Sequence, residues 1–226
     1  MKKVFFEAEP YPLEFELKST ALVMIDMQRD FVERGGFGEM LGNDVSLLRS
    51  TIEPCRHVLE AARKAGILVI HTREGHRPDL TDCPPTKLAR GRLKTKIGDP
   101  GPMGRILVRG ELGHDLIPEL YPIPGEPVVD KPGKGAFYDT DLLGILRNRE
   151  IKTLIVCGVT TEVCVHTTVR EANDRGFECI VPSDCTGSYF PEFKRVALEM
   201  IKAQGGIFGW VSTSDCVIEA LQAASA

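Results

Sequence analysis

Short, largely apolar runs alternate with longer segments of helical periodicity, and this alternation constrains the fold more than any other feature. Six such runs occupy residues 21–27, 67–72, 126–131, 153–158, 178–184 and 207–212. Apolar runs of this length are typical of parallel strands that are buried on both faces. The segments with helical spacing lie between them, at 52–66, 139–149, 162–175 and 191–204. The sequence therefore predicts a three-layer α/β fold: a doubly wound, six-stranded, mainly parallel sheet with helices on both faces.

The length of the chain is compatible with one domain that spans all 226 residues. One irregular stretch, at about 75–111, is rich in Pro, Gly, Arg and Asp and exceeds the usual length of a structural connection. We expect this stretch to form a lid or an interface loop.

Charge and cysteine usage narrow the class of protein. The net charge is -4 and the main basic cluster is Lys87–Lys96, which disfavours a general nucleic-acid surface. No signal peptide and no run of eighteen apolar residues is visible, so we expect no membrane partner. The seven cysteines are odd in number and lack CxxC spacing. This usage predicts free thiols in a reducing cytoplasm.

Three predicted strand ends carry reactive side chains, namely Asp26, Lys131 and Cys164. A cysteine in the first turn of a helix lies where the macrodipole favours a thiolate. A carboxylate can take the thiol proton, and a lysine can hold both carboxylate and substrate. Taken singly, Asp26 could be a helix or turn cap, Lys131 a solvated strand end and Cys164 a small buried apolar residue. We interpret Cys157, which lies inside a predicted strand, as such a buried residue. The coincidence of Asp26, Lys131 and Cys164 at one edge of the sheet favours catalysis.

The motifs "IDMQRDF" (25–31), "DKPGKGAFYDTDL" (130–142) and "CGVTTEVCVHTTVREANDRGFE" (157–178) resemble the isochorismatase-like cysteine hydrolases over nearly the whole chain. This resemblance implies that Asp26, Lys131 and Cys164 form a catalytic triad. It also implies an oxyanion hole from the backbone N–H groups of Thr160 and Cys164, with a cis peptide bond between Val159 and Thr160. Members are commonly homo-oligomers, often tetramers, and need no cofactor.

Within the family, "HTREGHRPDL" (71–80), "GDPGPMGRIL" (98–107), "KPGKGAF" (131–137) and "AQGGIFGWVS" (203–212) are most similar to the biuret hydrolases and their triuret-cleaving relatives. By this resemblance, Lys134 and Gln204 hold the distal polar atoms of a linear ureide and Phe31 lies against its plane. The alternatives for these three residues are a solvated loop lysine, a helix-terminal amide and a core aromatic.

Other ligand motifs are incomplete. The segment Gly133–Gly135 completes no phosphate-binding loop. His71 and His76 are five positions apart with Asp79 nearby, but a metal site would also need a defined third ligand on a rigid element. The metal motif of nicotinamidases is not found either, so we predict no metal. True isochorismatases cleave a vinyl ether without a cysteine nucleophile, so Cys164 favours amide cleavage.

The resulting hypothesis is an amidohydrolase that cleaves the terminal C–N bond of biuret or triuret through a Cys164 thioester, with Asp26 moving the protons. Ammonia and a carboxylated ureide, allophanate or carboxybiuret, are the expected products. The closest alternative is a hydrolase for ureidoacrylate or another N-carbamoyl compound. A non-catalytic binding protein on the same fold is the alternative from another class.

Overall fold

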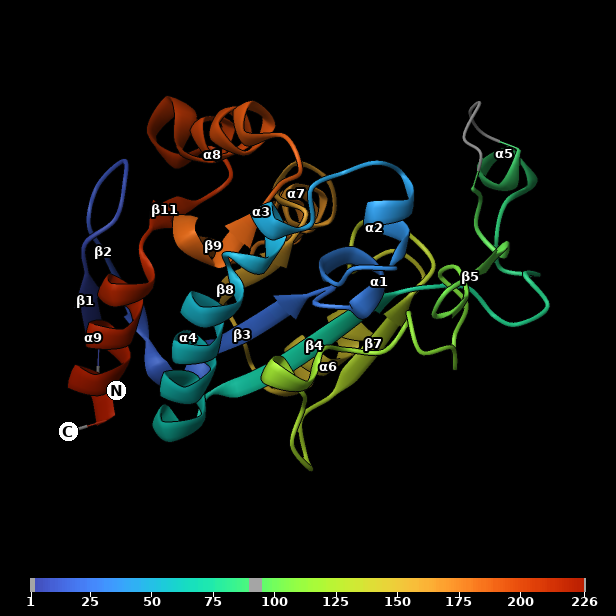
Figure 1. Ribbon diagram of the computed structural model, residues 1–226. Helices are drawn as coiled ribbons and strands as arrows, with labels where there is room; N and C mark the ends of the chain where they lie inside the picture. The colour runs from blue at the N-terminus through green and yellow to red at the C-terminus, as the bar shows by residue number, and fades with distance from the viewer. Residues whose placement is uncertain (1–2, 90–94, 226) are drawn as a thin grey trace.

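The computed structural model describes residues 3–89 and 95–225 and contains a seven-stranded central sheet (Figure 1). Six strands follow one another in the spatial order β11 (Trp210–Ser212), β9 (Glu178–Pro182), β8 (Thr153–Val159), β3 (Thr20–Ile25), β4 (Leu68–Glu74) and β7 (Val128–Lys131). Every neighbouring pair in the sheet is parallel. The doubly wound α/β prediction is confirmed. The seventh strand, β10 (Thr186–Gly187), pairs with β8 and was not predicted, because two residues leave no readable pattern.

Helices cover both faces of the sheet and create two apolar cores. On one face lie α4 (Ile52–Ala65) and α9 (Ser214–Ser225), and on the other lie α6 (Leu142–Asn148), α7 (His166–Asp174) and α8 (Pro191–Gly206). Side chains of β3 alternate between the cores, with Leu22 and Met24 in the first and Val23 in the second. This alternation follows from the two-residue period of a strand and explains why the buried strands are apolar throughout.

The remaining elements are short. An antiparallel hairpin of β1 (Lys3–Phe6) and β2 (Leu13–Glu16) precedes the sheet and was not predicted. The other short elements are η1 (Leu17–Ser19), α1 (Arg29–Val32), α2 (Phe37–Met40), α3 (Ser46–Arg49), η2 (Pro118–Leu120), the π-helical turn η3 (Thr161–Val165) and η4 (Ser183–Cys185). None of the helices in 3–89 and 95–225 is long and apolar enough to cross a membrane.

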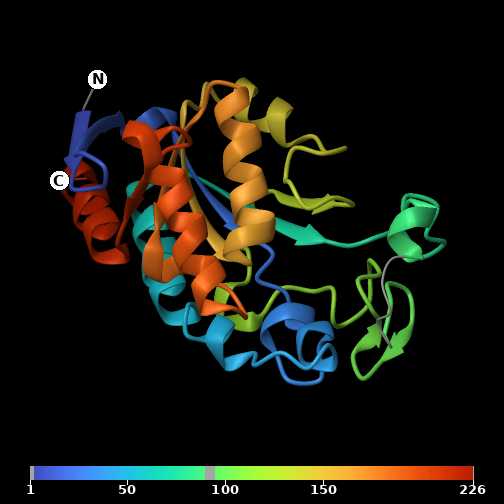
Figure 2. The same ribbon diagram turned by 90° about the horizontal axis from the view of Figure 1, so that it is seen from above.

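The predicted long loop at 75–111 projects past the carboxyl end of β4 (Figures 1 and 2). It carries the helical turn α5 (Pro85–Leu88) and a small hairpin of β5 (Pro100–Gly101) and β6 (Gly104–Arg105). Residues 90–94 of this loop and of the basic cluster lie outside the described part of the chain.

The order of the strands places a switch point between β3 and β8. The chain leaves β3 toward β4 and β7 and then crosses to β8 on the opposite side, continuing to β9 and β11. Connections on the two sides diverge there, which opens a crevice beyond the carboxyl ends of β3 and β8. Those ends lead directly to Asp26 and to the turn η3 that carries Cys164.

Candidate active site

Four strands deliver one reactive side chain each to this crevice. Asp26 follows β3 in the left-handed backbone region, with φ of 47°. Glu74 and Lys131 are the last residues of β4 and β7 and are paired in register. Cys164 lies in η3, after β8. Because all four strands are parallel, their carboxyl ends meet at one edge of the sheet and bring these side chains together.

Asp26 and Lys131 form an ion pair that is excluded from solvent. The Nζ of Lys131 lies 2.7 Å from Oδ2 of Asp26, and both side chains are 0% exposed. Thr72 donates its hydroxyl to Oδ1 of Asp26 at 2.6 Å. Lys131 also donates to the carbonyl oxygens of Gly133 and Lys134, each at 3.0 Å. These bonds fix the orientation of both charged groups.

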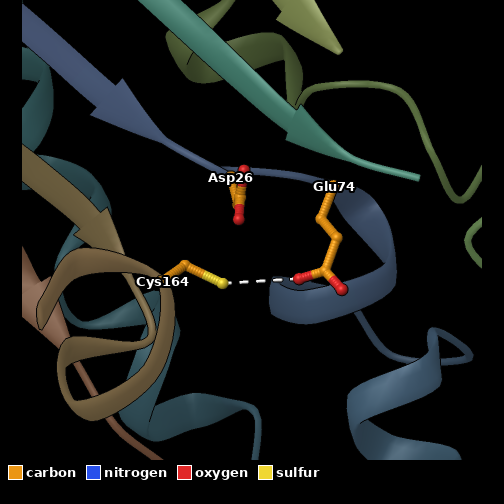
Figure 3. A group of neighbouring side chains, drawn as sticks. All are labelled: Asp26, Glu74 and Cys164. Atoms are coloured by element: carbon orange, nitrogen blue, oxygen red, sulfur yellow. Dashed lines mark hydrogen bonds between the residues drawn. The ribbon is translucent and has the colours of Figure 1, made fainter. Parts of the chain in front are cut away.

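Glu74 is a central residue of the site that sequence reasoning missed. Its Oε2 accepts a hydrogen bond from the Cys164 thiol at 3.4 Å, as Figure 3 shows. Its Oε1 lies 2.6 Å from the Nζ of Lys134 and 3.4 Å from that of Lys87. The predicted strand ended at residue 72, whereas β4 extends to Glu74. An acidic residue just beyond a strand at the reactive edge was the available signal.

The pKa values of the two carboxyl groups, Asp26 and Glu74, are shifted in opposite directions. Burial raises the pKa of Asp26 more than Lys131 lowers it, and the charge of Glu74 adds to the rise. Burial also acts to raise the pKa of Glu74, but Lys131, Lys134 and Lys87 together hold that pKa at about 2. Asp26 is therefore the stronger base, and Glu74 stays ionised.

The thiol of Cys164 is held in its neutral form. Burial raises its pKa well above the usual value, against the opposing charge of Lys131. We expected the start of a helix to favour the thiolate, but here exclusion from water outweighs the macrodipole. A base must therefore remove the proton before the sulfur can act as a nucleophile. A carboxylate oxygen of Asp26 lies within 4.8 Å of the sulfur.

Asp26, Glu74 and Cys164 together resemble a set of metal ligands. One ligand atom from each lies within 4.8 Å of the others. However, the ammonium group of Lys131 lies 2.7 Å from Asp26 and 3.8 Å from Glu74, so this lysine already supplies the positive charge between them. The donor set is therefore complete without a cation. His71, considered above as a ligand, instead contacts Glu126 at 3.0 Å.

Cys164 opens into a cavity of about 260 Å³, and three further predicted residues line it. Phe31, Lys134 and Thr160 are in its wall, together with Phe37, Gly38, Leu41, Asn43, Glu74, Val159, Glu162, Val163, Tyr189 and Phe190. The peptide bond between Val159 and Thr160 is cis, as predicted. Cys157 lies on the opposite face of β8, buried in the other apolar core.

Gln204 does not line this cavity, unlike Phe31 and Lys134, the other two residues predicted to contact the substrate. Phe190, at the start of α8, lines the cavity, whereas Gln204 is exposed at the far end of that helix. Regular helix from Phe190 to Lys202 separates them by roughly 18 Å at 1.5 Å per residue. The helical period of 191–204 could not indicate which end of the helix faces the crevice.

Two polar residues of the "IDMQRDF" motif support the site from behind. The side-chain amide of Gln28 accepts from the backbone N–H of Glu74 at 2.7 Å and donates to the carbonyl of Glu74 at 3.0 Å. Asp30 is buried and accepts from the backbone N–H groups of Phe37 and Leu107, at 3.3 and 3.1 Å. The motif therefore fixes the end of β4 and ties α2 to the long loop.

Comparison with known proteins identifies the family. Residues 20–216 match the Isochorismatase domain family. The ureidoacrylate amidohydrolase RutB of Azorhizobium caulinodans is 33% identical over 211 residues, which cover 91% of this chain and 92% of that protein. A cysteine hydrolase from Pseudomonas syringae pv. phaseolicola 1448A superposes with a TM-score of 0.77 and 27% identity, covering 99% of this chain and 100% of that one. N-carbamoylsarcosine amidase from Thermoplasma acidophilum gives a TM-score of 0.66 at 27% identity, with coverage of 87% and 97%. Because the family model matches most of the chain and the fold is shared with solved members, the chain belongs to the isochorismatase family of hydrolases.

Proposed function

We propose that this protein is a cysteine amidohydrolase that cleaves the carbamoyl C–N bond of an N-carbamoyl compound, with ureidoacrylate as the leading candidate. The observation that carries the proposal is the position of the Cys164 side chain, which lies in the wall of a cavity beside the buried Asp26–Lys131 pair. The relatives named above support an amide of this class, since their names specify a ureido acid and an N-carbamoyl amino acid.

The first half-reaction forms a covalent intermediate. Asp26 accepts the thiol proton, and the Cys164 sulfur adds to the ureido carbonyl carbon. The bond to the terminal nitrogen then breaks, and that nitrogen takes the proton from Asp26 and leaves as ammonia. A thioester-type S-acyl group remains on Cys164. The raised pKa of Asp26 suits both transfers, since a strongly acidic carboxyl group would hold the thiol proton too weakly.

The second half-reaction restores the enzyme. Asp26 takes a proton from water, the resulting hydroxide adds to the acyl carbon, and the C–S bond breaks. The sulfur then recovers the proton from Asp26. The product is an N-carboxylated amine, which loses carbon dioxide. Lys131 keeps Asp26 oriented throughout, and Glu74 stays ionised and holds Lys134 at the cavity wall.

The developing oxyanion requires donors beside the sulfur. We assign this role to the backbone N–H groups of Thr160, which directly precedes η3, and Cys164, which lies within it, because both residues line the same cavity. Loss of one such donor typically costs about 3 to 4 kcal/mol of transition-state stabilisation.

Biuret and triuret would be cleaved by the same chemistry, and they remain the second candidate because Lys134 lines the cavity as that hypothesis requires. The position of Gln204 weighs against them, because the second residue assigned to the distal polar atoms is exposed at the far end of α8. A ureido acid needs no such amide.

Ammonia release from ureidoacrylate, N-carbamoyl amino acids, biuret, triuret and nicotinamide tests the proposal. We expect kcat/KM to be highest for a ureido acid, and trapping with acid should yield protein whose mass is increased at Cys164. Highest activity on biuret would favour the second candidate. A protein that binds these compounds yet releases no ammonia from any of them would refute catalysis and leave the non-catalytic alternative.

A further inference from the structure

A second, larger cavity, here called the outer cavity, adjoins the cavity lined by Cys164, here called the inner cavity. Its volume is about 520 Å³, and it shares Phe37, Leu41 and Lys134 with the inner cavity. The other residues of its wall come from the long loop and from the segment after β7: Pro84, Thr86, Lys87, Thr95, Lys96, Ile97, Leu107, Pro132, Gly133 and Tyr138. Lys134 therefore stands at the junction between the two cavities.

The charged side chains that line the outer cavity are all positive. Lys87, Lys96 and Lys134 line it, and none of the described lining residues is acidic. A concave surface with one sign of charge concentrates counter-ions of the opposite sign.

The three lysines differ in how they are held. Lys87 is half-buried and held in place, since its Nζ lies 2.8 Å from the carbonyl oxygen of Pro132, 3.0 Å from Nε2 of His76 and 3.4 Å from Glu74. Lys134 shares Glu74 and is 48% exposed. Lys96 is exposed and forms no ion pair with a residue in 3–89 or 95–225. One amine is therefore rigid and two can reach a ligand.

The charges at the junction do not cancel. Asp26 is matched by Lys131, which leaves Glu74 to neutralise both Lys87 and Lys134. With Cys164 in its thiol form, these five ionised groups carry three positive and two negative charges. An anionic group of the ligand that enters beside Lys134 would remove this imbalance.

We propose that the outer cavity is the subsite for the carboxylate of the substrate, with Lys134 and Lys96 as its ligands and Lys87 as a fixed positive charge. This inference rests on the proposed function and narrows its substrate class to N-carbamoyl acids. The ureido group occupies the inner cavity against Cys164, and the acid arm extends past Lys134 into the outer one. Neutral ureides leave this subsite unfilled.

Charge reversal at Lys96 tests the subsite, because this exposed side chain can be changed without disturbing the core. We compare kcat/KM for ureidoacrylate with that for its neutral methyl ester, both measured by ammonia release. Lys96→Glu should reduce the acid-to-ester ratio by about tenfold, mainly through the KM of the acid. Lys64→Glu, an equal charge change on the exposed side of α4, should leave the ratio unchanged.

Salt provides an independent measurement. The KM of the acid should rise with ionic strength in the wild-type protein and rise less in Lys96→Glu, because exposed charges are screened. An unchanged ratio in Lys96→Glu, or equal kcat/KM for acid and ester in the wild type, would overturn the subsite while leaving the amidohydrolase intact. Absence of ammonia from both compounds would instead refute the proposed function.

Discussion

Glu74 shows how much of this site depends on a single buried carboxylate. It contacts the nucleophile candidate Cys164 and three ammonium groups, and its side chain is 1% exposed. A lone buried charge is costly, but three neighbouring lysines stabilise this one and hold its pKa at about 2. Glu74 therefore links the ammonium group of Lys134 to the Cys164 thiol.

Replacement of the nucleophile tests the division of roles between the two cysteines of "CGVTTEVCV". Cys164→Ser should fold and bind substrate, yet lower kcat by roughly 10³-fold or more, because an unactivated hydroxyl is a far weaker nucleophile. Cys157→Ala is the matched control: it removes buried volume at a cost of about 1 to 3 kcal/mol in unfolding free energy and should retain activity. Equal losses of kcat in two folded variants would refute this division.

Glu74 also makes stability depend on pH in a predictable direction. Its pKa of about 2 in the folded protein lies below the ordinary value of 4.5, so its contribution is present above pH 4.5 and is lost as the pH falls toward 2. The shift corresponds to on the order of 3 kcal/mol at neutral pH. Glu74→Gln should therefore be clearly destabilised at pH 7 and much less so at pH 3.

Urea unfolding of wild type and Glu74→Gln at both pH values measures this difference. The charge of Glu74 also contributes to the raised pKa of Asp26, which acts against stability at neutral pH, so the gap measured at pH 7 is the net of these two opposing contributions. A gap in unfolding free energy that is the same at pH 7 and pH 3 would show that Glu74 is not ionised in the folded protein.

At the scale of elements, the end of β8 depends on close contact with β3. Gly158 has φ of 111°, and a Cβ placed on it would lie 2.0 Å from the carbonyl oxygen of Ile25. Only glycine allows β8 to approach the last residue of β3 so closely. This approach sets the distance between Asp26, which follows Ile25, and Thr160, which follows the strand.

Two glycine-to-alanine substitutions should have opposite effects. Gly158→Ala forces the strands apart and should lower the unfolding free energy by about 3 kcal/mol or more, with loss of activity. Gly144→Ala, within α6 and with no heavy atom near its added Cβ, should raise stability by up to about 1 kcal/mol through helix propensity. Thermal unfolding distinguishes them, and a fully stable Gly158→Ala would show that the contact between β3 and β8 is not tight.

At the scale of the whole molecule, α8 leaves apolar side chains on the surface beside the cavity. Phe193 and Met200, seven residues and about two turns apart, are 53% and 46% exposed on the same side of the helix. Phe190, at the start of α8, is 48% exposed and also lines the cavity. Exposed apolar groups that cluster in this way are typical of association surfaces.

We therefore predict that the protein is a homo-oligomer, with a tetramer as the expected state. Phe193→Glu should lower the sedimentation coefficient and, if a neighbouring chain completes the site, reduce kcat/KM as well. Phe5→Glu, which alters an equally exposed phenylalanine on the β1–β2 hairpin, serves as the control. A wild-type monomer that is fully active in solution would contradict the prediction.

Periodicity and strand-end chemistry in the sequence determined the parallel α/β fold and the approach of Asp26, Lys131 and Cys164, because parallel strands necessarily place their carboxyl ends at one edge. Only the tertiary structure decided that β4 extends to Glu74, that Lys87 and Lys134 share this carboxylate, and that Gln204 does not line the cavity beside Cys164. Glu74 and Lys134 are 60 positions apart in the sequence, and Glu74 and Cys164 are 90 positions apart. These contacts depend on strand register and on the direction of each helix, which local propensity does not encode.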